Sequence, residues 1–394
     1  MAILGILVAN ITAFSHNQLA YYWPPALPGG ATAGDDWIWV VQFTLIDGKM
    51  RGIFAILFGA GLVLFARKAG EIEVATQLQA RRLFWLALFG FAHFALLFGG
   101  DILFTYAIAG MFALLALPYG ARGLFVTGVL WAAVAALLRA GDFAPYAIME
   151  LQAMAGHAPD QYPALEAYWQ GRVADIMNDA RVLASGSYLD VVAQRISTGA
   201  DEAGLAVRLN FYETIPQMLI GMGLFKAGLF TDPALRRRWR GWAWGGAIIG
   251  AALLLATAIT LMRMGFPPYL TQFAYFALAL LFNLPLLLGG ILLLTQWADR
   301  SDATWLGERL RLAGRMAFTN YILTSFVMML IFQGWAGGLF GTLHRIELLP
   351  VVALGWAIML TVSRFWLSRF RYGPLEWLWR CLTYWRIFDI RRTH

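Results

Sequence analysis

The stretch RRLFWLALFGFAHFALLFGGDILFTYAIAGMFALLAL, residues 81–117, decides how this chain folds. It holds two apolar runs separated only by Gly-Gly-Asp, and each run is close to the roughly 20 residues that a helix needs to cross a bilayer. The pattern predicts two membrane helices joined by a tight turn. His93 lies inside the first run and Asp101 opens the second. Because ionisable groups are costly in lipid, they usually face a bundle interior or a polar cavity. The pair is therefore the first candidate for a functional site.

The composition is that of a membrane protein. Of the 394 residues, 60% are hydrophobic and 13% are charged, whereas soluble proteins carry about 25% charged residues. The apolar runs do not alternate with polar residues, so the expected fold is an all-α, polytopic helix bundle. The net charge of +7 lies in short connections, which argues against a nucleic-acid partner. The single cysteine, Cys381, excludes an internal disulfide framework.

Ten apolar runs are predicted to span the membrane. They cover residues 1–14, 37–66, 83–98, 101–117, 121–138, 209–225, 241–262, 269–296, 316–333 and 348–367. No basic region precedes the first run, so no cleavable signal peptide is expected. The expected organisation is a five-span half (1–140), an extracytoplasmic helical loop or cap (141–208), a second five-span half (209–370) and a cytoplasmic interfacial helix with a tail (371–394).

The positions of Lys and Arg set the predicted orientation. Alternate connections place twenty-one of these residues on one side of the spans and six on the other. Connections rich in Lys and Arg stay in the cytoplasm. Both termini are therefore predicted to be cytoplasmic, and the long segment 141–208 is predicted to lie outside.

Two segments outside the spans are expected to form amphipathic helices. In 141–208, residues around Trp169 repeat near helical spacing, and Ser187 is placed to cap a helix over 188–196. This segment is either a lid or a loop that only packs on the bundle. In 373–388, apolar residues at helical spacing are flanked by arginines, which favours an anionic-lipid anchor over a partner-binding helix.

His93 and Asp101 each have a functional and a structural interpretation. His93 is predicted to lie in the outer half of the bilayer, where a histidine can act as a general base or simply hydrogen-bond between helices. Asp101 directly precedes a helix, where an aspartate is an ordinary N-cap. It can orient His93 only if the glycine turn folds it back, and the two jobs are compatible.

The run 37–66 contains a charged cluster of Asp47, Gly48, Lys49 and Arg51. A long helix with such a cluster is expected to break at Gly48 or to enter a polar cavity. Asp47 and Arg51 are four residues apart and can neutralise each other, while Lys49 points elsewhere. The cluster is thus either an internal salt bridge or part of a site.

The run 209–225 carries Glu213 in its outer half, and Pro216 is expected to interrupt it. A proline in a membrane helix frees backbone groups that a polar cavity can satisfy. His93, Lys49 and Glu213 come to a similar depth from three helices, so we predict that they share one polar chamber.

The remaining polar residues and glycine spacings are weaker indications of a functional site. Polar groups inside or beside apolar runs are Asn10, Asn210, Asn283, Asn320 and Tyr321, and asparagines there more often bond between helices than bind ligands. The sequence Gly221-Met222-Gly223 indicates close helix packing. No metal-ligand spacing and no nucleotide-binding glycine loop is present, so no metal is expected.

The chain resembles the YeiB-like family of bacterial membrane proteins. The matching stretches are AILGILVANITAF (2–14), GKMRGIFAILFGAGL (48–62), RRLFWLALFGFAHFALLFGGDILFTYAIAGM (81–111), GRMAFTNYILTS (314–325) and FRYGPLEWLWRCLTYWR (370–386). The likeness covers most of the chain except 141–208. Members of that family usually begin with an acidic residue and an Arg-Gly pair before the first span, whereas Met1 here opens the apolar run.

The first half is also distantly similar to transmembrane acyltransferases, which move acyl groups from a cytoplasmic donor to extracytoplasmic sugars. The resemblance implies a multi-pass protein of the bacterial inner membrane and an acyltransferase that uses an acyl-CoA-type donor. Its partners would be membrane lipids and a glycan, lipid or small-molecule acceptor, and a homo-oligomer is left open. The alternative is a transporter or lipid-handling protein without covalent chemistry.

The expected roles follow from these interpretations. The catalytic candidates are His93, Asp101 and Lys49, with Lys49 stabilising oxyanion charge. The substrate-binding candidates are Asp47, Arg51, Glu213, Asn210, Asn10, Asn320 and Tyr321. The candidates for binding donor phosphates are Arg81, Arg82, Arg236, Arg237 and Arg238.

Overall fold

The structure is a computed structural model that describes residues 1–301 and 304–392, without the side chains of residues 69, 198, 200–203 and 205–211. Its helices are α1 Ala2–Ser15, α2 Gln18–Tyr22, η1 Pro24–Ala26, α3 Ala33–Leu45, α4 Lys49–Ala69, α5 Ile72–Leu96, α6 Leu103–Leu114, α7 Ala121–Met154, α8 Tyr162–Ser185, α9 Tyr188–Lys226, α10 Pro233–Arg263, α11 Pro268–Phe273, η2 Ala274–Leu278, α12 Ala279–Ser301, α13 Trp305–Arg315, α14 Ala317–Phe332, α15 Leu348–Arg369 and α16 Pro374–Tyr384. The described residues form no strand beyond one isolated bridge between Phe370 and Arg391. The predicted all-α class is confirmed.

Five helical stretches are long and apolar enough to cross a membrane. They are Ala33–Lys68, Ala121–Met154, Pro233–Arg263, Pro268–Ser301 and Leu348–Arg369. The helices α13 and α14, bent by 86°, add a sixth if they form one broken span. Helices α1 and α6 are apolar but shorter. The chain is therefore a helical membrane protein with five or six candidate spans.

The predicted break in the second run lies at Gly48. Helix α3 ends at Leu45, and α4 begins at Lys49. Gly48 has φ +75°, a left-handed conformation that glycine adopts without steric cost. A Cβ atom there would lie 2.7 Å from Nδ2 of Asn283, so the break also lets α12 approach closely.

Helices α4 and α9 pack backbone to backbone. A Cβ atom on Gly221 would lie 1.9 Å from the carbonyl oxygen of Ile56, and one on Gly59 would lie 2.1 Å from that of Met218. The prediction of close packing at Gly221 is confirmed. Pro216, in contrast, does not interrupt its helix, because α9 continues through it to Lys226.

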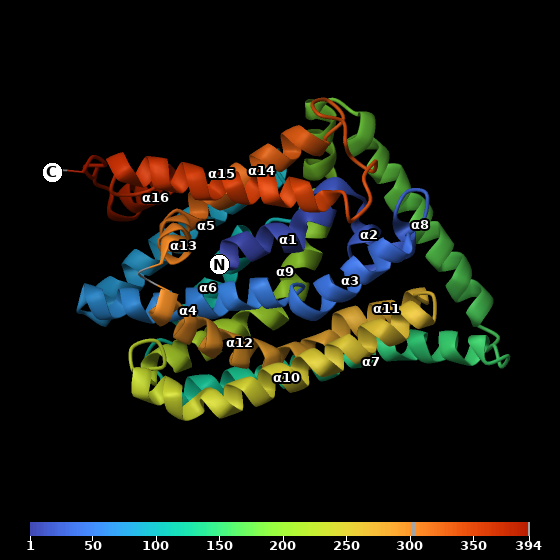
Figure 1. The fold of residues 1–394 in the computed structure, drawn as a ribbon, viewed down its shortest axis with the longest axis horizontal. Coiled ribbons are helices and arrows are strands. Elements are labelled where there is room, and N and C mark those ends of the chain that lie inside the picture. The colour runs from blue at the N-terminus through green and yellow to red at the C-terminus, as the bar shows by residue number, and fades with distance from the viewer. Residues whose placement is uncertain (302–303, 393–394) are drawn as a thin grey trace.

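The segment 141–208 packs on one end of the bundle. It contains the end of α7, all of α8 and the start of α9, so its helices are longer than predicted. Ser187 caps α9, as expected, by accepting from the backbone N–H of Asp190. Trp169 on α8 lies 5.1 Å from Trp23 and 5.7 Å from Tyr269, measured between ring centroids. Helix α8 crosses the end opposite to α16 and the C-terminus (Figure 1).

The amphipathic helix predicted near the C-terminus is α16. It packs against α5 and α14. The charge pattern predicts that these ends of α5 and α14 face the cytoplasm. Glu376 accepts hydrogen bonds from the backbone N–H groups of Phe318 (2.8 Å) and Thr319 (3.1 Å), and from the Thr319 hydroxyl (2.5 Å). Its carboxylate thus satisfies the orphan donors at the start of α14.

Candidate functional site

The centre of the candidate site is a buried His-Asp pair. Nδ1 of His93 lies 2.7 Å from Oδ1 of Asp101, and the two side chains are 0% and 2% exposed. The carboxylate oxygen is the acceptor of this contact, so Nδ1–H donates to it and Nε2 is the ring nitrogen left for another partner. Within the described part of the chain, that Nε2 atom is buried and has no hydrogen-bond partner.

The turn between α5 and α6 brings the pair together. Helix α5 ends where Leu97 and Phe98 both donate to the carbonyl oxygen of His93 at 2.9 Å. Gly90 lets α6 approach, since a Cβ atom there would lie 2.3 Å from the backbone nitrogen of Phe104. The same Phe104 N–H donates to Oδ2 of Asp101 at 2.8 Å. Asp101 therefore folds back to His93. Ile102, not Asp101, is the N-cap residue of α6, but the Asp101 carboxylate still accepts from an N–H in the first turn, as a cap does.

Tyr321 packs beside the pair and shares a small cavity with Asn10. The ring of Tyr321 lies 4.8 Å from the imidazole of His93, between centroids. Tyr321 and Asn10 also line a small cavity of about 10 Å³ with Phe14 and Ser325. These two substrate-binding candidates therefore lie together in the wall of one small cavity, and Tyr321 also packs against His93.

The charges of the second run form a different group. The ammonium of Lys49 donates to the carbonyl oxygen of Phe43. Asp47 accepts from the amide of Gln42 at 3.2 Å. Asp47 precedes the left-handed Gly48 and lies outside α4, so it does not form the helical pair with Arg51. Arg51 instead forms an ion pair with Glu213 at 2.9 Å.

Glu213, the acidic member of the ion pair with Arg51, lines a pocket. This pocket has a volume of about 30 Å³ and lies between α4, α7, α9 and α12. Its polar lining comes from Glu213, Tyr212, Gln217 and Asn283. The candidate residues thus fall into three contact groups, around His93, Asp47 and Glu213. Among the described side chains, no hydrogen bond joins Lys49 or Glu213 to the His93–Asp101 pair.

A buried arginine is the main feature that the sequence reasoning missed. Arg345 lies in the turn before α15 and is 1% exposed. Its guanidinium donates to Gln42 Oε1 at 3.1 Å, to Thr12 Oγ1 at 3.3 Å and to the carbonyl oxygen of Ala20. Gln42 therefore links Arg345 to Asp47. The sequence shows Arg345 only as a basic residue in an external connection, and no local signal reveals its burial.

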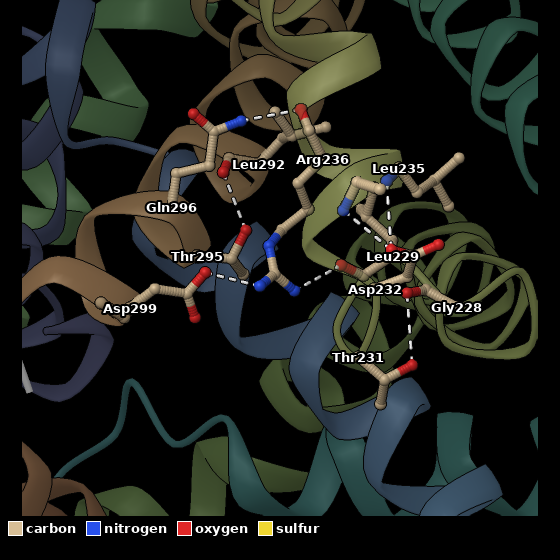
Figure 2. Close-up of polar contacts among 12 residues, drawn as sticks. Gly228, Leu229, Thr231, Asp232, Leu235, Arg236, Leu292, Thr295, Gln296 and Asp299 are labelled. Atoms are coloured by element: carbon tan, nitrogen blue, oxygen red, sulfur yellow. Dashed lines mark hydrogen bonds and ion pairs between the residues drawn. The ribbon is translucent and has the colours of Figure 1, made fainter.

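The arginines proposed to bind the donor are spread over two regions. Arg81 and Arg82 contact α16: Arg81 donates to the carbonyl oxygen of Thr383 at 3.1 Å, and Arg82 lies 4.5 Å from the ring of Trp379. Arg236 is buried, donates to the carbonyl oxygen of Leu229 at 3.0 Å and forms an ion pair with Asp299 at 2.5 Å (Figure 2). It holds the α9–α10 turn against α12.

Three of the five arginines predicted to bind the acyl donor therefore make contacts within the protein, and the other two are exposed. Arg237 and Arg238 are exposed beside Arg236 at the start of α10. An exposed guanidinium can meet a phosphate directly, whereas Arg236 would first have to leave Asp299 and Leu229. Arg237 and Arg238 are thus the better placed of the five.

Two asparagines, Asn320 and Asn210, were also predicted to bind substrate. Asn320 is fully buried and donates to Ser363 Oγ at 2.9 Å and to the carbonyl oxygen of Ala313 at 3.0 Å. It links α13, α14 and α15, which is the structural interpretation of such residues. The side chain of Asn210 lies outside the described residues.

The fold and the site define a helical integral membrane protein with ionisable side chains buried on several helices. Residues 224–386 match the family model described as "Protein of unknown function (DUF418)". The chain is 32% identical to "Uncharacterized protein YeiB" of Escherichia coli (strain K12), over 97% of this chain and 94% of that protein. It is 27% identical to "Uncharacterized protein YxaH" of Bacillus subtilis (strain 168), over 98% and 92% respectively. The chain belongs to the YeiB-like family. No solved structure matches it.

Proposed function

We propose that this chain is a membrane-embedded acyltransferase. It moves an acyl group from a cytoplasmic acyl-CoA-type donor to an extracytoplasmic hydroxyl or amine of a glycan, lipid or small molecule. The observation that carries this proposal is the His93–Asp101 pair, in which a buried imidazole keeps Nε2 without a partner among the described residues. A histidine held in one tautomer by a carboxylate is suited to general base catalysis.

The proposed reaction needs one base and one acid. Nε2 of His93 takes the proton of the acceptor hydroxyl as its oxygen attacks the thioester carbonyl. The tetrahedral intermediate collapses, the carbon–sulfur bond breaks, and the imidazolium returns the proton to the leaving thiolate. The products are an ester and a free thiol. Lys49 is not used in this step, because its ammonium is bound to the carbonyl oxygen of Phe43 in a separate contact group.

The proposal includes an orientation in the bacterial inner membrane. We place ten spans across it, with both termini in the cytoplasm and α8 outside. Each of the ten apolar runs overlaps at least one helix of the structure, and α8 lies at the end opposite to the C-terminus (Figure 1). The exposed Arg237 and Arg238 then face the cytoplasm, where they would meet donor phosphates.

The test is transfer by the full chain in lipid nanodiscs. Acetyl-, octanoyl- and palmitoyl-CoA are supplied with an extract of bacterial membrane glycolipids, and release of free thiol is measured. We expect His93→Gln to lower the rate by about 10²- to 10⁴-fold. His157→Gln serves as the matched control, because His157 is an exposed histidine after α7. Absence of thiol release from the wild type, or an unchanged rate in His93→Gln, contradicts the proposal.

A transporter is the second candidate, and the break between α3 and α4 favours it. Asp47 and Lys49 are buried on either side of Gly48, and broken helices with buried charges are typical of substrate sites in transporters. The two functions differ in a measurable way. A transporter moves a solute in sealed proteoliposomes without consuming a thioester, whereas the acyltransferase consumes it stoichiometrically.

A further inference from the structure

The first turns of α10 concentrate arginine and tryptophan in one short stretch. Residues 236–244 read RRRWRGWAW, and only the first of these four arginines, Arg236, is buried. The exposed members are the α10 arginines, Arg237, Arg238 and Arg240, and the α10 tryptophans, Trp239, Trp242 and Trp244. Trp242 alone is 78% exposed. Rings and guanidinium groups exposed side by side suit a partner that is apolar at one end and anionic at the other.

The α10 arginines have no anionic partner among the residues that the structure describes. The two carboxylates beside them are already engaged (Figure 2). Asp232 accepts from the backbone N–H groups of Ala234 at 2.8 Å and Leu235 at 3.3 Å, and Asp299 is paired with Arg236 at 2.5 Å. The three exposed guanidinium groups make no hydrogen bond, ion pair or ring contact within the described part of the chain. Their positive charges are therefore available to a ligand.

Along the exposed surface of α10, charged side chains are followed by aromatic and then by aliphatic ones. Residues three, four or seven apart lie on one face of a helix. Two adjacent stripes therefore form, Arg237 with Trp244 and Ile248, and Arg238 with Trp242 and Ile249. The two isoleucines are 61% and 58% exposed on a helix long and apolar enough to cross a membrane, where exposed aliphatic groups meet lipid chains.

The spacing along α10 matches the layers of a phospholipid. Four residues separate Arg238 from Trp242, which is about 6 Å at 1.5 Å per residue. The interfacial layer on each side of the hydrocarbon is roughly 5–8 Å thick. Tryptophan favours this layer, and a guanidinium binds phosphate through parallel hydrogen bonds. A Cβ atom on Gly241 or Gly245 would meet nothing within 4 Å, so the surface between the rings and the arginines is open.

We propose that this face of α10 binds an anionic phospholipid. Its phosphate lies among the α10 arginines, its glycerol beside the α10 tryptophans, and its acyl chains along Ile248 and Ile249. An anionic lipid is favoured over a zwitterionic one, because the protein itself does not balance the charge of these arginines. The inference goes beyond the proposed function, since neither His93 nor a thioester takes part. Donor phosphates at Arg237 and Arg238 would use the same phosphate chemistry, so the donor is the rival occupant.

The test compares dioleoyl phosphatidylglycerol with dioleoyl phosphatidylcholine, which has the same chains and phosphate but no net charge. Thermal unfolding of the full chain in a non-ionic detergent is followed by its tryptophan fluorescence. A bound ligand raises the unfolding midpoint. We expect phosphatidylglycerol to raise it by about 2 °C or more above phosphatidylcholine. The difference should vanish in the triple variant Arg237→Gln, Arg238→Gln, Arg240→Gln.

The matched control is the triple variant Arg67→Gln, Lys68→Gln, Arg122→Gln. It removes the same number of positive charges at exposed positions on the same predicted side of the membrane, and it should keep the difference. A further variant, Trp242→Ala with Trp244→Ala, leaves every arginine in place and changes only exposed side chains. We expect it to reduce the difference by about half or more, because the lipid then loses the rings on which it packs.

Equal midpoints with the two lipids in the wild type overturn the proposal. So does a difference that survives in the α10 arginine variant, that is lost equally in the control triple, or that is unchanged in the tryptophan variant. Coenzyme A without lipid tests the rival occupant. If it raises the midpoint through the α10 arginines and phosphatidylglycerol does not, the surface belongs to the donor and the lipid proposal is overturned. All of these readouts measure binding, so they stand or fall separately from thiol release in the acyl-transfer assay.

Discussion

Nδ1 of His93 lies 2.7 Å from Oδ1 of Asp101, although eight residues and a Gly-Gly turn separate the two along the chain. The second oxygen of the same carboxylate accepts from the N–H of Phe104 at 2.8 Å. One aspartate therefore fixes the tautomer of the histidine and the start of α6 together. The two roles can be separated by mutation, because they use different oxygens.

The first prediction concerns Asp101→Asn. The N–H of Phe104 needs an acceptor, so the Asn oxygen should stay with Phe104 and the Asn amide N–H₂ should face His93. Nδ1 would then have to accept, which moves the ring proton to Nε2 and removes the base. We expect acyl transfer to fall by about 10²- to 10⁴-fold, while the unfolding midpoint stays close to that of the wild type.

The matched variant is Asp101→Ala, which removes the cap as well as the partner of His93. It should lose transfer to a similar degree and also lose about 1 kcal/mol of stability. Transfer is measured as thiol release across a range of pH, and stability by thermal unfolding in detergent. If Asp101→Asn retained the rate and the pH profile of the wild type, Asp101 would be only a helix cap.

Much of the fold could be predicted because membrane helices leave strong local signals. The helical class, the Gly48 break, the Ser187 cap and the close packing at Gly221 all depend on neighbouring residues or on glycine itself, and all appear in the structure. Of the ten predicted spans, five or six are long and apolar enough to cross a membrane. The His93–Asp101 contact could be predicted only conditionally, because it depends on how the glycine turn folds.

The grouping of the charges could not be predicted, because it depends on contacts between distant parts of the chain. Arg51 and Glu213 are 162 residues apart, and Arg345 and Gln42 are 303 residues apart. Equal depth in the membrane does not determine which helix faces which. The sequence therefore placed Lys49, Glu213 and His93 at similar depth, whereas the structure gives them different partners.

Arg345→Met tests whether the buried arginine holds α1, α2 and α3 together. The substitution keeps much of the volume but leaves Gln42 Oε1, Thr12 Oγ1 and the carbonyl oxygen of Ala20 without this donor. Each buried group left unsatisfied costs about 1–3 kcal/mol, so we expect a loss of more than about 3 kcal/mol. Arg263→Met, at an exposed position in the last turn of α10, should change stability by less than about 0.5 kcal/mol. Equal unfolding midpoints for the two variants would show that Arg345 is dispensable.

Gly221→Ala tests the close packing of α4 and α9. The added Cβ atom would lie 1.9 Å from the carbonyl oxygen of Ile56, which is backbone and cannot rotate away. We expect the helices to separate, at a cost of about 1–3 kcal/mol. Gly61→Ala on α4 is the control, because its Cβ atom meets nothing within 4 Å. It should be neutral or slightly stabilising, since alanine favours helix. A neutral Gly221→Ala in thermal unfolding would contradict this packing.

Glu376→Ala tests whether α16 is fastened to the bundle by its carboxylate. Without it, the N–H groups of Phe318 and Thr319 lose their acceptor at the start of α14. We expect a loss of about 1–3 kcal/mol and a loosened α16. The loosening can be measured at Cys381, which is buried on α16 and should react faster with a maleimide in the variant. Glu376→Gln keeps an acceptor oxygen and should remain slow, as should Glu308→Ala at an exposed position on α13. Equal labelling rates in all three variants would mean that apolar packing alone holds α16 in place.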